Sequence, residues 1–267
     1  MTKKGKSAEQ KSTPTSLLHY TSMDVLTILL KDAIENEDHF SFHASIAHAM
    51  NDRIEGKLVI DKFFTDSMAS IENKKILKTV TEERGEIFTI AFSRSKERYP
   101  NGQIPMWKMY GDNGRGVVLR FNYKLLSFFC KSKNYSLNKC QYITQSDEFV
   151  ARCLRNEVKK EREMSLQPDE MNKVLREAYI YKERHWKYED EYRMIIQSTD
   201  YKIKKGTYGI TPYIVVPIPI QCLTGITIGP LAEQDVAEKS LNILVPKLKG
   251  ICPDLDLSIH TSKLQLR

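Results

Sequence analysis

The amino-acid sequence predicts a single α+β domain. Segments rich in β-branched and aromatic residues stand near both ends of the chain, and the segments with apolar residues at helical spacing gather between them. This order favours an α+β fold over regular alternation of strands and helices. The chain has 267 residues, of which 41% are hydrophobic and 28% charged. That size and balance are typical of a folded globular domain.

The chain is expected to begin with a disordered basic leader over residues 1–16. Four lysines against one glutamate give this leader a charge of +3, which leaves +4 of the net +7 for the rest. We expect residues 17–267 to form the single domain. Its first unit is a strand over 17–21 and then a helix, because Ser22 is placed to cap a helix and apolar residues recur at helical spacing over 26–33.

The remaining elements follow from the same two periodicities. Residues 42–80 are predicted to be mainly helical, with a break at 51–55. Helices are also predicted within 146–185, the second of them starting at Pro168, and over 233–244, before Pro246. Strands are predicted at 86–92, 116–121, 192–196, 213–220, 224–228 and 255–259.

The sharpest local pattern is the segment from Trp186 to Arg193, WKYEDEYR. If a strand has already begun at Glu189, then Glu189, Glu191 and Arg193 share one face. Two carboxylates beside a guanidinium can stabilise a developing positive charge, orient hydroxyls or act as a base, because each neighbour shifts the pKa of the others. The alternative is a solvated edge strand with a surface salt bridge.

A second group of candidates lies at the ends of two predicted strands. His19, Tyr20 and Thr21 end the first strand, where they can bind a ribose hydroxyl or stack on a planar ring. Ser93 directly follows the strand at 86–92, where it can hold a phosphate. A structural histidine and an ordinary turn are the alternative interpretations.

Trp107 and Tyr110 are the aromatic candidates, since a spacing of three places them on one face of a helical turn. The Gly-rich turn after them, GDNGRG, is neither a Walker loop nor a dinucleotide fingerprint.

No metal site or membrane segment is expected. The five cysteines are widely spread without a CxxC pair, so neither a disulfide framework nor a zinc cluster is indicated. The sequence contains no apolar run of about 18 residues and no secretory signal, so the protein is expected to be cytoplasmic.

Several short motifs, taken in order, resemble those of one family. They are HYTS at 19–22, ND..E at 51–55, FS at 92–93, MWKMYGDNGRGVVLRF at 106–121, W.YEDEYR at 186–193 and SKLQLR at 262–267. The family is widespread in bacteria and is recorded as a domain of unknown function. The order of a first-strand His or Tyr, a middle aromatic or serine segment and a late-strand glutamate is also similar to the His-Tyr-Glu branch of the ADP-ribosyltransferase superfamily.

This second resemblance implies a fold of central mixed or antiparallel sheets with flanking helices, and NAD as a co-substrate without a metal. Glu191 would be the catalytic glutamate, with Glu189 beside it. Tyr110 and Trp107 would stack near the nicotinamide. The other residues implied to contact NAD are His19, Tyr20, Thr21, Ser93 and Arg193.

The expected function is mono-ADP-ribosylation of a macromolecule by a toxin or phage-defence effector, with a neutralising antitoxin as partner. The net charge and the basic region at 152–162 favour RNA or DNA as the acceptor, although interleaved glutamates also fit a solvated helix. A non-catalytic module that binds nucleic acid or protein, an NAD glycohydrolase and a nuclease remain the alternatives.

Overall fold

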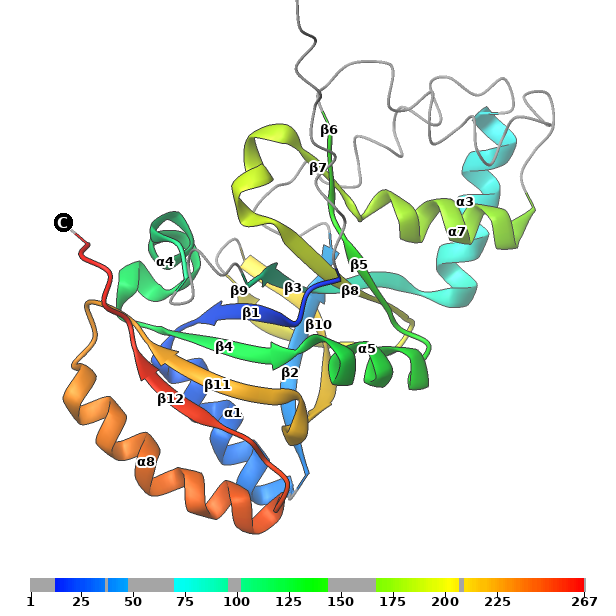
Figure 1. Cartoon of the computed structure of the whole chain (residues 1–267). Coiled ribbons are helices and arrows are strands. Elements are labelled where there is room, and N and C mark those ends of the chain that lie inside the picture. Colours follow the sequence, from blue (N-terminus) through cyan, green and yellow to red (C-terminus); the bar gives the residue numbers. More distant parts are fainter. Residues whose placement is uncertain are drawn as a thin grey trace, which may run out of the picture.

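The chain forms a large sheet with helices on both of its faces (Figure 1). The computed structural model describes residues 13–36, 38–47, 70–95, 102–143, 167–206 and 209–266. Within these ranges the mixed sheet and its flanking helices confirm the predicted α+β class. Three features of the sequence lie outside them: residues 1–12 of the expected leader, the break at 51–55 and the basic region at 152–162.

The described elements are six α-helices, three 3-10 helices and twelve strands. The α-helices are α1 (Met23–Asn36), α3 (Ser70–Arg84), α4 (Ile104–Tyr110), α5 (Tyr123–Ser132), α7 (Pro168–Ala178) and α8 (Gln234–Ile251), and the 3-10 helices are η2 (Asp112–Gly114), η3 (Arg184–Glu189) and η4 (Ile220–Cys222). The strands are β1 (Ser16–Thr21), β2 (His39–Ile46), β3 (Glu86–Arg94), β4 (Val117–Asn122), β5 (Ser136–Lys139), β6 (Gln141–Ile143), β7 (Tyr181–Glu183), β8 (Glu191–Ser198), β9 (Lys202–Gly206), β10 (Gly209–Pro219), β11 (Leu223–Ile228) and β12 (Ser258–Thr261).

Strand β3 is the branch point of the large sheet. One of its edges pairs antiparallel with β8 from Glu86 to Ser93. The other edge pairs with β1 at one end, where Leu18 lies opposite Ser93, and with β2 at the other end, where Ser45 lies opposite Thr89. The sheet therefore runs β12-β11-β4-β1-β3-β2-β10-β9, and β8 continues from β3 to β5. Strands β6 and β7 form a separate parallel pair.

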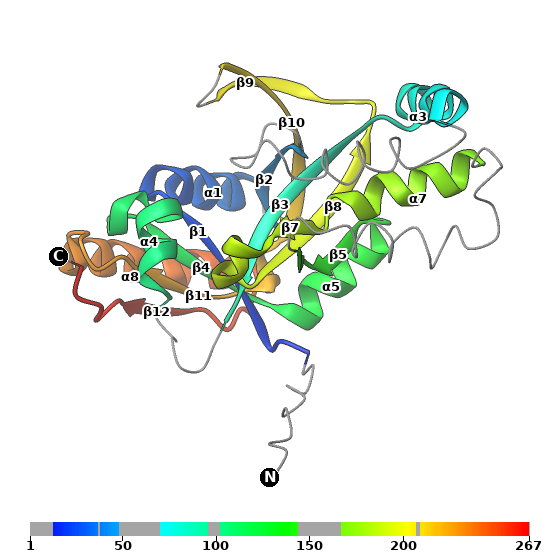
Figure 2. The same ribbon diagram turned by 90° about the horizontal axis from the view of Figure 1, so that it is seen from above.

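The two faces of the large sheet carry separate cores. Helices α1, α5 and α8 cover one face, where alternate residues such as Leu17 and Phe92 are buried. On the opposite face Tyr20 packs with Trp107 of α4, whereas Ile195 packs with residues of α3 and α7. Figure 2 shows α4 and the α3–α7 pair at opposite ends of the molecule. Burial of alternate residues on both faces fixes the register of each central strand.

Most of the predicted elements are confirmed to within a few residues. They are β1, β3, β4, β8, β10, β11 and the helix that starts at Pro168. Ser22 caps α1 as expected, because its Oγ accepts a hydrogen bond from the amide of Val25 at 3.2 Å.

The helical prediction for residues 42–80 is wrong at its beginning, where the chain forms β2. The side chains of β2 alternate between buried and more exposed positions, which is the period of a strand. Its backbone pairs with β10 on one edge and β3 on the other. Helix α3 confirms the last part of that prediction, whereas residues 48–69 lie outside the described ranges.

Two boundaries near the C-terminus also differ from the prediction. Helix α8 continues through Pro246 to Ile251, because Leu241 and Leu248 on either side of the proline are both buried in the core and outweigh one lost backbone hydrogen bond. The last strand begins at Ser258 rather than at 255, since only 258–261 reach β11 for pairing.

The turn from α3 into β3 depends on Gly85. Its φ is +86°, and a Cβ atom there would stand 2.0 Å from the carbonyl oxygen of Ser198. We expect Gly85→Ala to lower the free energy of unfolding by at least about 2 kcal/mol, because backbone strain and the main-chain clash add. Urea unfolding measures the loss. Gly250→Ala in α8 is the matched control, since no described atom lies within 4 Å of its Cβ position; equal stability of the two variants would contradict the prediction.

Candidate active site

Glu189 and Glu191 converge on one buried lysine. The strand does not begin at Glu189 as the one-face prediction required: Glu189 ends η3, β8 begins at Glu191, and Asp190 between them has a left-handed backbone with φ 44°. The alternative of a solvated edge strand is also wrong, because β8 pairs with both β3 and β5. Lys182 of β7 places its Nζ 2.6 Å from Glu189 Oε2 and 2.9 Å from Glu191 Oε2. Lys182 is 7% exposed and each glutamate 3%. A single buried ammonium therefore joins the two carboxylates.

Arg193 fixes the orientation of Glu191 from the same face of β8. Its Nε donates to Glu191 Oε1 at 2.5 Å and its Nη2 to Oε2 at 3.3 Å. Its Nη1 donates to the carbonyl oxygen of Tyr179 at 2.8 Å. This two-point contact is the strong form of an arginine–carboxylate pair, and it restrains the direction as well as the charge of the carboxylate.

Two tyrosines complete the surroundings of the glutamates. The hydroxyl of Tyr110 at the end of α4 donates to Glu189 Oε1 at 2.7 Å. The hydroxyl of Tyr142 on β6 accepts a hydrogen bond from the amide of Glu191 at 2.7 Å. Tertiary contacts thus bring together residues from α4, β6, β7, η3 and β8.

The surroundings shift the pKa values of the two glutamates in opposite directions. Burial raises the pKa of Glu189, and the hydrogen bonds and charge of Lys182 and the bond from Tyr110 offset it only in part. Burial also acts to raise the pKa of Glu191, but the charges of Arg193 and Lys182 outweigh it and hold that pKa below its ordinary value. Glu191 is therefore an anion at neutral pH, whereas Glu189 takes up a proton more readily than an ordinary glutamate.

These opposite shifts predict opposite dependences of stability on pH. Glu191 stabilises the fold above its ordinary pKa, and this contribution is lost as the pH falls through its folded pKa. For Glu189 the favourable state is the protonated one, so its contribution is present at low pH and is lost as the pH rises through its folded pKa. We expect the loss of stability in Glu191→Gln to be constant above about pH 5 and to shrink as the pH falls below about 4. We expect the stability of Glu189→Gln to rise relative to that of wild type as the pH rises above about 4. Urea unfolding at several pH values measures both, and parallel curves for the two variants would contradict the assignment.

The structure brings five of the other predicted site residues to the face of the sheet that carries Glu191. Ser93 lies directly opposite Glu191 in the β3–β8 ladder and is 4% exposed. Arg193 and Tyr110 contact the glutamates as described above. Tyr20 and Trp107 pack together edge to face with ring centroids 5.3 Å apart, and Trp107 is 0% exposed.

His19 and Thr21 lie on the opposite face, because successive residues of a strand point to opposite sides. The backbone pairing of β1 with β3 ends at Leu18. His19 Nδ1 then donates to the carbonyl oxygen of Ala91 at 2.9 Å, and its ring packs against Phe42 and Phe92. Burial lowers the pKa of His19, so the ring is neutral with its proton on Nδ1. His19 thus bridges β1 and β3 where the two strands separate.

Lys182 and Tyr142 were not recognised as site residues from the sequence. Both stand in segments that are rich in charged or polar residues, and such segments are typical of exposed helices or loops. The short parallel pairing of β6 with β7, which places Tyr142 opposite Lys182, leaves no periodic signal in the sequence.

The aromatic side chain of Trp186 lies beside the charged residues of the site. The Nζ of Lys182 lies 5.0 Å from the centroid of the Trp186 ring. The rings of His185 and Tyr188 flank Trp186 with centroids 5.0 and 6.1 Å away. The indole Nε1 is buried and has no hydrogen-bond partner among the described residues, so it is a donor that a ligand can satisfy.

The described part of the chain shows neither a metal-binding cluster nor a membrane-spanning helix. No group of three or more His, Cys, Asp or Glu side chains there could hold a metal ion. None of the described helices has both the length and the apolar character needed to cross a membrane.

Residues 106–194 match a family model described as "Protein of unknown function (DUF2971)". The match confirms the predicted resemblance to a domain-of-unknown-function family. The matched segment begins in α4 and ends in β8, so it includes Tyr110, Lys182, Glu189, Glu191 and Arg193. Comparisons with curated proteins and with solved structures gave no significant match.

Proposed function

We propose that this chain is an NAD-dependent mono-ADP-ribosyltransferase of the cytoplasm, with Glu191 facing the reacting ribose. The observation that carries the proposal is the pair of carboxylates held on one ammonium with opposite pKa shifts. Such a pair offers a permanent anion and a proton acceptor at one place, which is how two carboxyl groups divide the work of glycosidic bond cleavage.

In the proposed reaction the bond between the ribose C1′ and the nicotinamide nitrogen breaks, and its electron pair leaves with nicotinamide. Positive charge then develops on the ribose. The fixed negative charge of Glu191 stabilises this state more than it stabilises the bound substrate. The acceptor attacks C1′, and its proton passes to Glu189, whose raised pKa makes it the better proton acceptor of the two.

The side chains around the glutamates support binding of a nicotinamide ring and its ribose. Tyr110 is half-buried and already holds Glu189. The Nε1 of Trp186 lacks a partner among the described residues, and an amide oxygen is the kind of acceptor it needs. Ser93 lies opposite Glu191, where its hydroxyl can bind a ribose hydroxyl. Trp107 is fully buried, so we assign it the support of Tyr20 rather than stacking on the substrate.

We further propose nucleic acid as the acceptor and a neutralising protein as a partner. The formal net charge of +7 supports a polyanionic acceptor. The proposal of a neutralising partner rests only on the proposed role of the chain as a toxin. Co-purification of the protein with the products of neighbouring genes tests it. Isolation of the active chain without any bound protein would argue against an antitoxin.

The decisive experiment incubates the purified protein with labelled NAD in a lysate and then separates the RNA, DNA and protein pools. Label that depends on Glu191 in one pool would support transfer and would identify the acceptor class. Nicotinamide release without a labelled pool would indicate an NAD glycohydrolase instead.

A non-catalytic binding module is the second candidate, and one observation favours it. The charges of Glu189, Glu191, Lys182 and Arg193 balance, and each of these side chains is at most 7% exposed. Such a cluster can hold η3 and β7 against β8 without taking part in any reaction. Absence of both label and nicotinamide release would decide for this candidate.

A further inference from the structure

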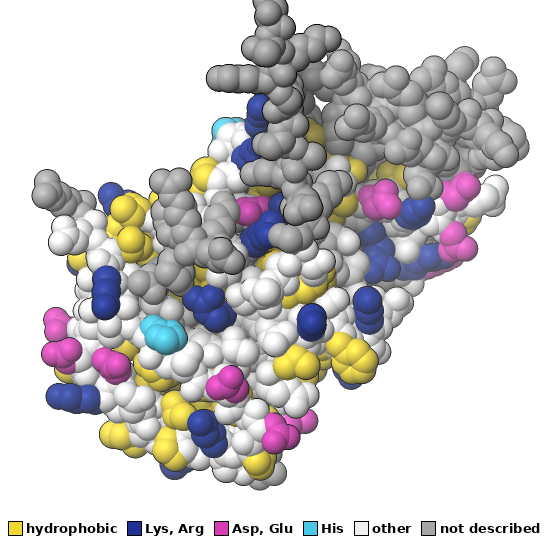
Figure 3. Space-filling model, viewed as in Figure 1, with side chains coloured by type: hydrophobic (Ala, Val, Ile, Leu, Met, Phe, Trp, Pro, Cys, Tyr) yellow, Lys and Arg dark blue, Asp and Glu magenta, His cyan; other side chains and the backbone are white. Residues whose placement is uncertain are grey.

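Strands β2, β9 and β10 carry basic and aromatic side chains without any acidic one. Their sequences are HFSFHASI, KIKKG and GITPYIVVPIP. The hairpin of β9 and β10 extends away from the rest of the molecule (Figure 2). Over the end of the molecule that carries α8, by contrast, acidic and basic side chains are interspersed (Figure 3). Every charged side chain that these three strands contribute is therefore basic.

The pairing register places the basic and aromatic side chains on one face. Lys202 lies opposite Tyr213, and Lys204 lies opposite Thr211. Tyr213 lies opposite Ser45, two residues from His43 on the same side of β2. Because directly opposite residues of antiparallel strands point to the same side, these side chains share a face.

This face is continuous with that of the glutamates. Ser45 of β2 lies opposite Thr89 of β3, and Thr89 is an even number of residues from Ser93, which lies opposite Glu191. Side chains an even number apart in a strand point to the same side. A ligand on β10 and β9 would thus lie on the same side of the sheet as Glu191.

The side chains on this face form a stack. The rings of His43 and Tyr213 lie 4.3 Å apart at 40°, and Lys204 Nζ lies 5.1 Å from the centroid of the Tyr213 ring. His43 and Lys202 are exposed, while Tyr213 and Lys204 are half-buried. These side chains therefore contact one another and are still open to a ligand.

The lysines make this platform electropositive. Burial is the largest effect that lowers the pKa of His43, and the charges of Lys204 and Lys202 lower it further. Asp32 of α1 acts in the opposite direction, without cancelling the shift. A neutral imidazole on a tyrosine beside two ammonium groups is suited to stack on a base while the lysines bind phosphate.

We propose that this platform, formed by His43, Tyr213, Lys202 and Lys204, binds single-stranded nucleic acid. Unpaired bases are required, since only they expose a ring face for stacking on the platform, whereas the ring faces of a duplex are stacked on one another. Only one part of this inference rests on the proposed function, namely that the platform is where the acceptor of that reaction binds. Binding itself needs neither NAD nor turnover.

The test measures fluorescence anisotropy of labelled 20-mers of oligo(U) and oligo(dT), and of a 20-base-pair duplex, with the full chain and without NAD. Tyr213→Ala and Lys204→Glu are each expected to weaken binding of the single strands about tenfold or more, because one stacked base and one phosphate contact are lost. Tyr213→Phe keeps the ring and should bind within about twofold of wild type. Comparison of oligo(U) with oligo(dT) shows whether RNA or DNA is preferred.

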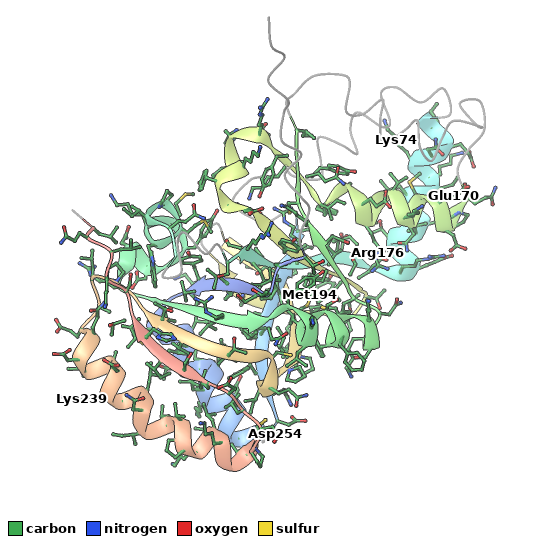
Figure 4. The ribbon with its side chains drawn as sticks, viewed as in Figure 1. Lys74, Glu170, Arg176, Met194, Lys239 and Asp254 are labelled. Atoms are coloured by element: carbon green, nitrogen blue, oxygen red, sulfur yellow. The ribbon has the colours of Figure 1, made fainter. Side chains whose placement is uncertain are left out.

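Lys239→Glu is the matched control, because it makes the same charge change on α8 (Figure 4). It should leave binding within about twofold of wild type, as long-range charge effects are screened at physiological salt. Circular dichroism verifies that each variant is folded. Failure of the wild type to bind either single strand would overturn the inference, and so would equal weakening by Lys204→Glu and Lys239→Glu. A protein that binds these strands but does not consume NAD would contradict the proposed function alone.

Discussion

Glu191→Gln is expected to lower the rate of NAD cleavage by about two to three orders of magnitude. Glutamine has nearly the same shape and keeps an oxygen for Arg193 Nε, but it removes the negative charge that would face the ribose. An interaction that acts mainly in the transition state lowers kcat and kcat/KM together when it is removed. The measurement is nicotinamide release under saturating and limiting NAD.

The control for this variant must separate chemistry from folding, because Glu191 is buried and ion-paired. Glu82→Gln changes an exposed glutamate of α3 whose nearest cation is Lys78 at 3.7 Å, so it should have wild-type activity. Thermal unfolding of Glu191→Gln shows the temperature range in which it is folded, and the rates are compared within that range. A folded Glu191→Gln with wild-type nicotinamide release would contradict the assigned role.

Lys182→Met is expected to lower the free energy of unfolding by about 3 to 5 kcal/mol. Methionine fills a similar volume but leaves two buried carboxylates with Arg193 as their remaining described cation. Loss of the ammonium raises the pKa of Glu189 further, so the variant should be less destabilised at about pH 5 than at about pH 8. Urea unfolding at the two pH values measures the difference.

Lys139→Met is the matched control for Lys182→Met. Lys139 pairs with Asp190 at 2.9 Å, next to the same glutamates, but its side chain is 47% exposed. Although the side chain of Asp190 is only 15% exposed, solvent reaches the half-exposed Lys139 and screens its charge, so its removal should cost no more than about 1 kcal/mol. Glu189→Gln added to Lys182→Met should recover part of the lost stability by restoring the charge balance. If both lysine variants lose the same small amount, Lys182 does not hold the two carboxylates.

Not every central strand could be recognised from the sequence. The strands β3, β4, β8 and β11 are recognisable because they are short segments rich in apolar residues, many of them β-branched or aromatic. β2 was not recognised, since its alternating small and aromatic residues carry two histidines and two serines. Its strand conformation depends on pairing with β3 and β10, whose residues are distant in the chain.

The candidate site could likewise be predicted from the sequence only in part. The sequence identified Glu189, Glu191 and Arg193, because they fall at alternate positions next to a strong strand. It also suggested Tyr110, although nothing in the spacing placed that hydroxyl on a glutamate 79 residues away. The direction of each pKa shift could not be derived, because it depends on which cations and hydroxyls surround a carboxylate after folding.

By itself, then, the sequence determined the α+β class, most of the strands and the line of charged residues that begins β8. Local hydrophobic period and residue type specify these properties, and both act between neighbours in the chain. Only the tertiary structure decided that His19 bonds to Ala91 and that Tyr20 packs on Trp107. It alone also decided that Lys182 joins the two glutamates and that His43 stacks on Tyr213. These contacts depend on how separate elements pack, even for Lys182 and the two glutamates, which are close in sequence. Burial and charge pairing acquire their strength only when such elements meet away from water.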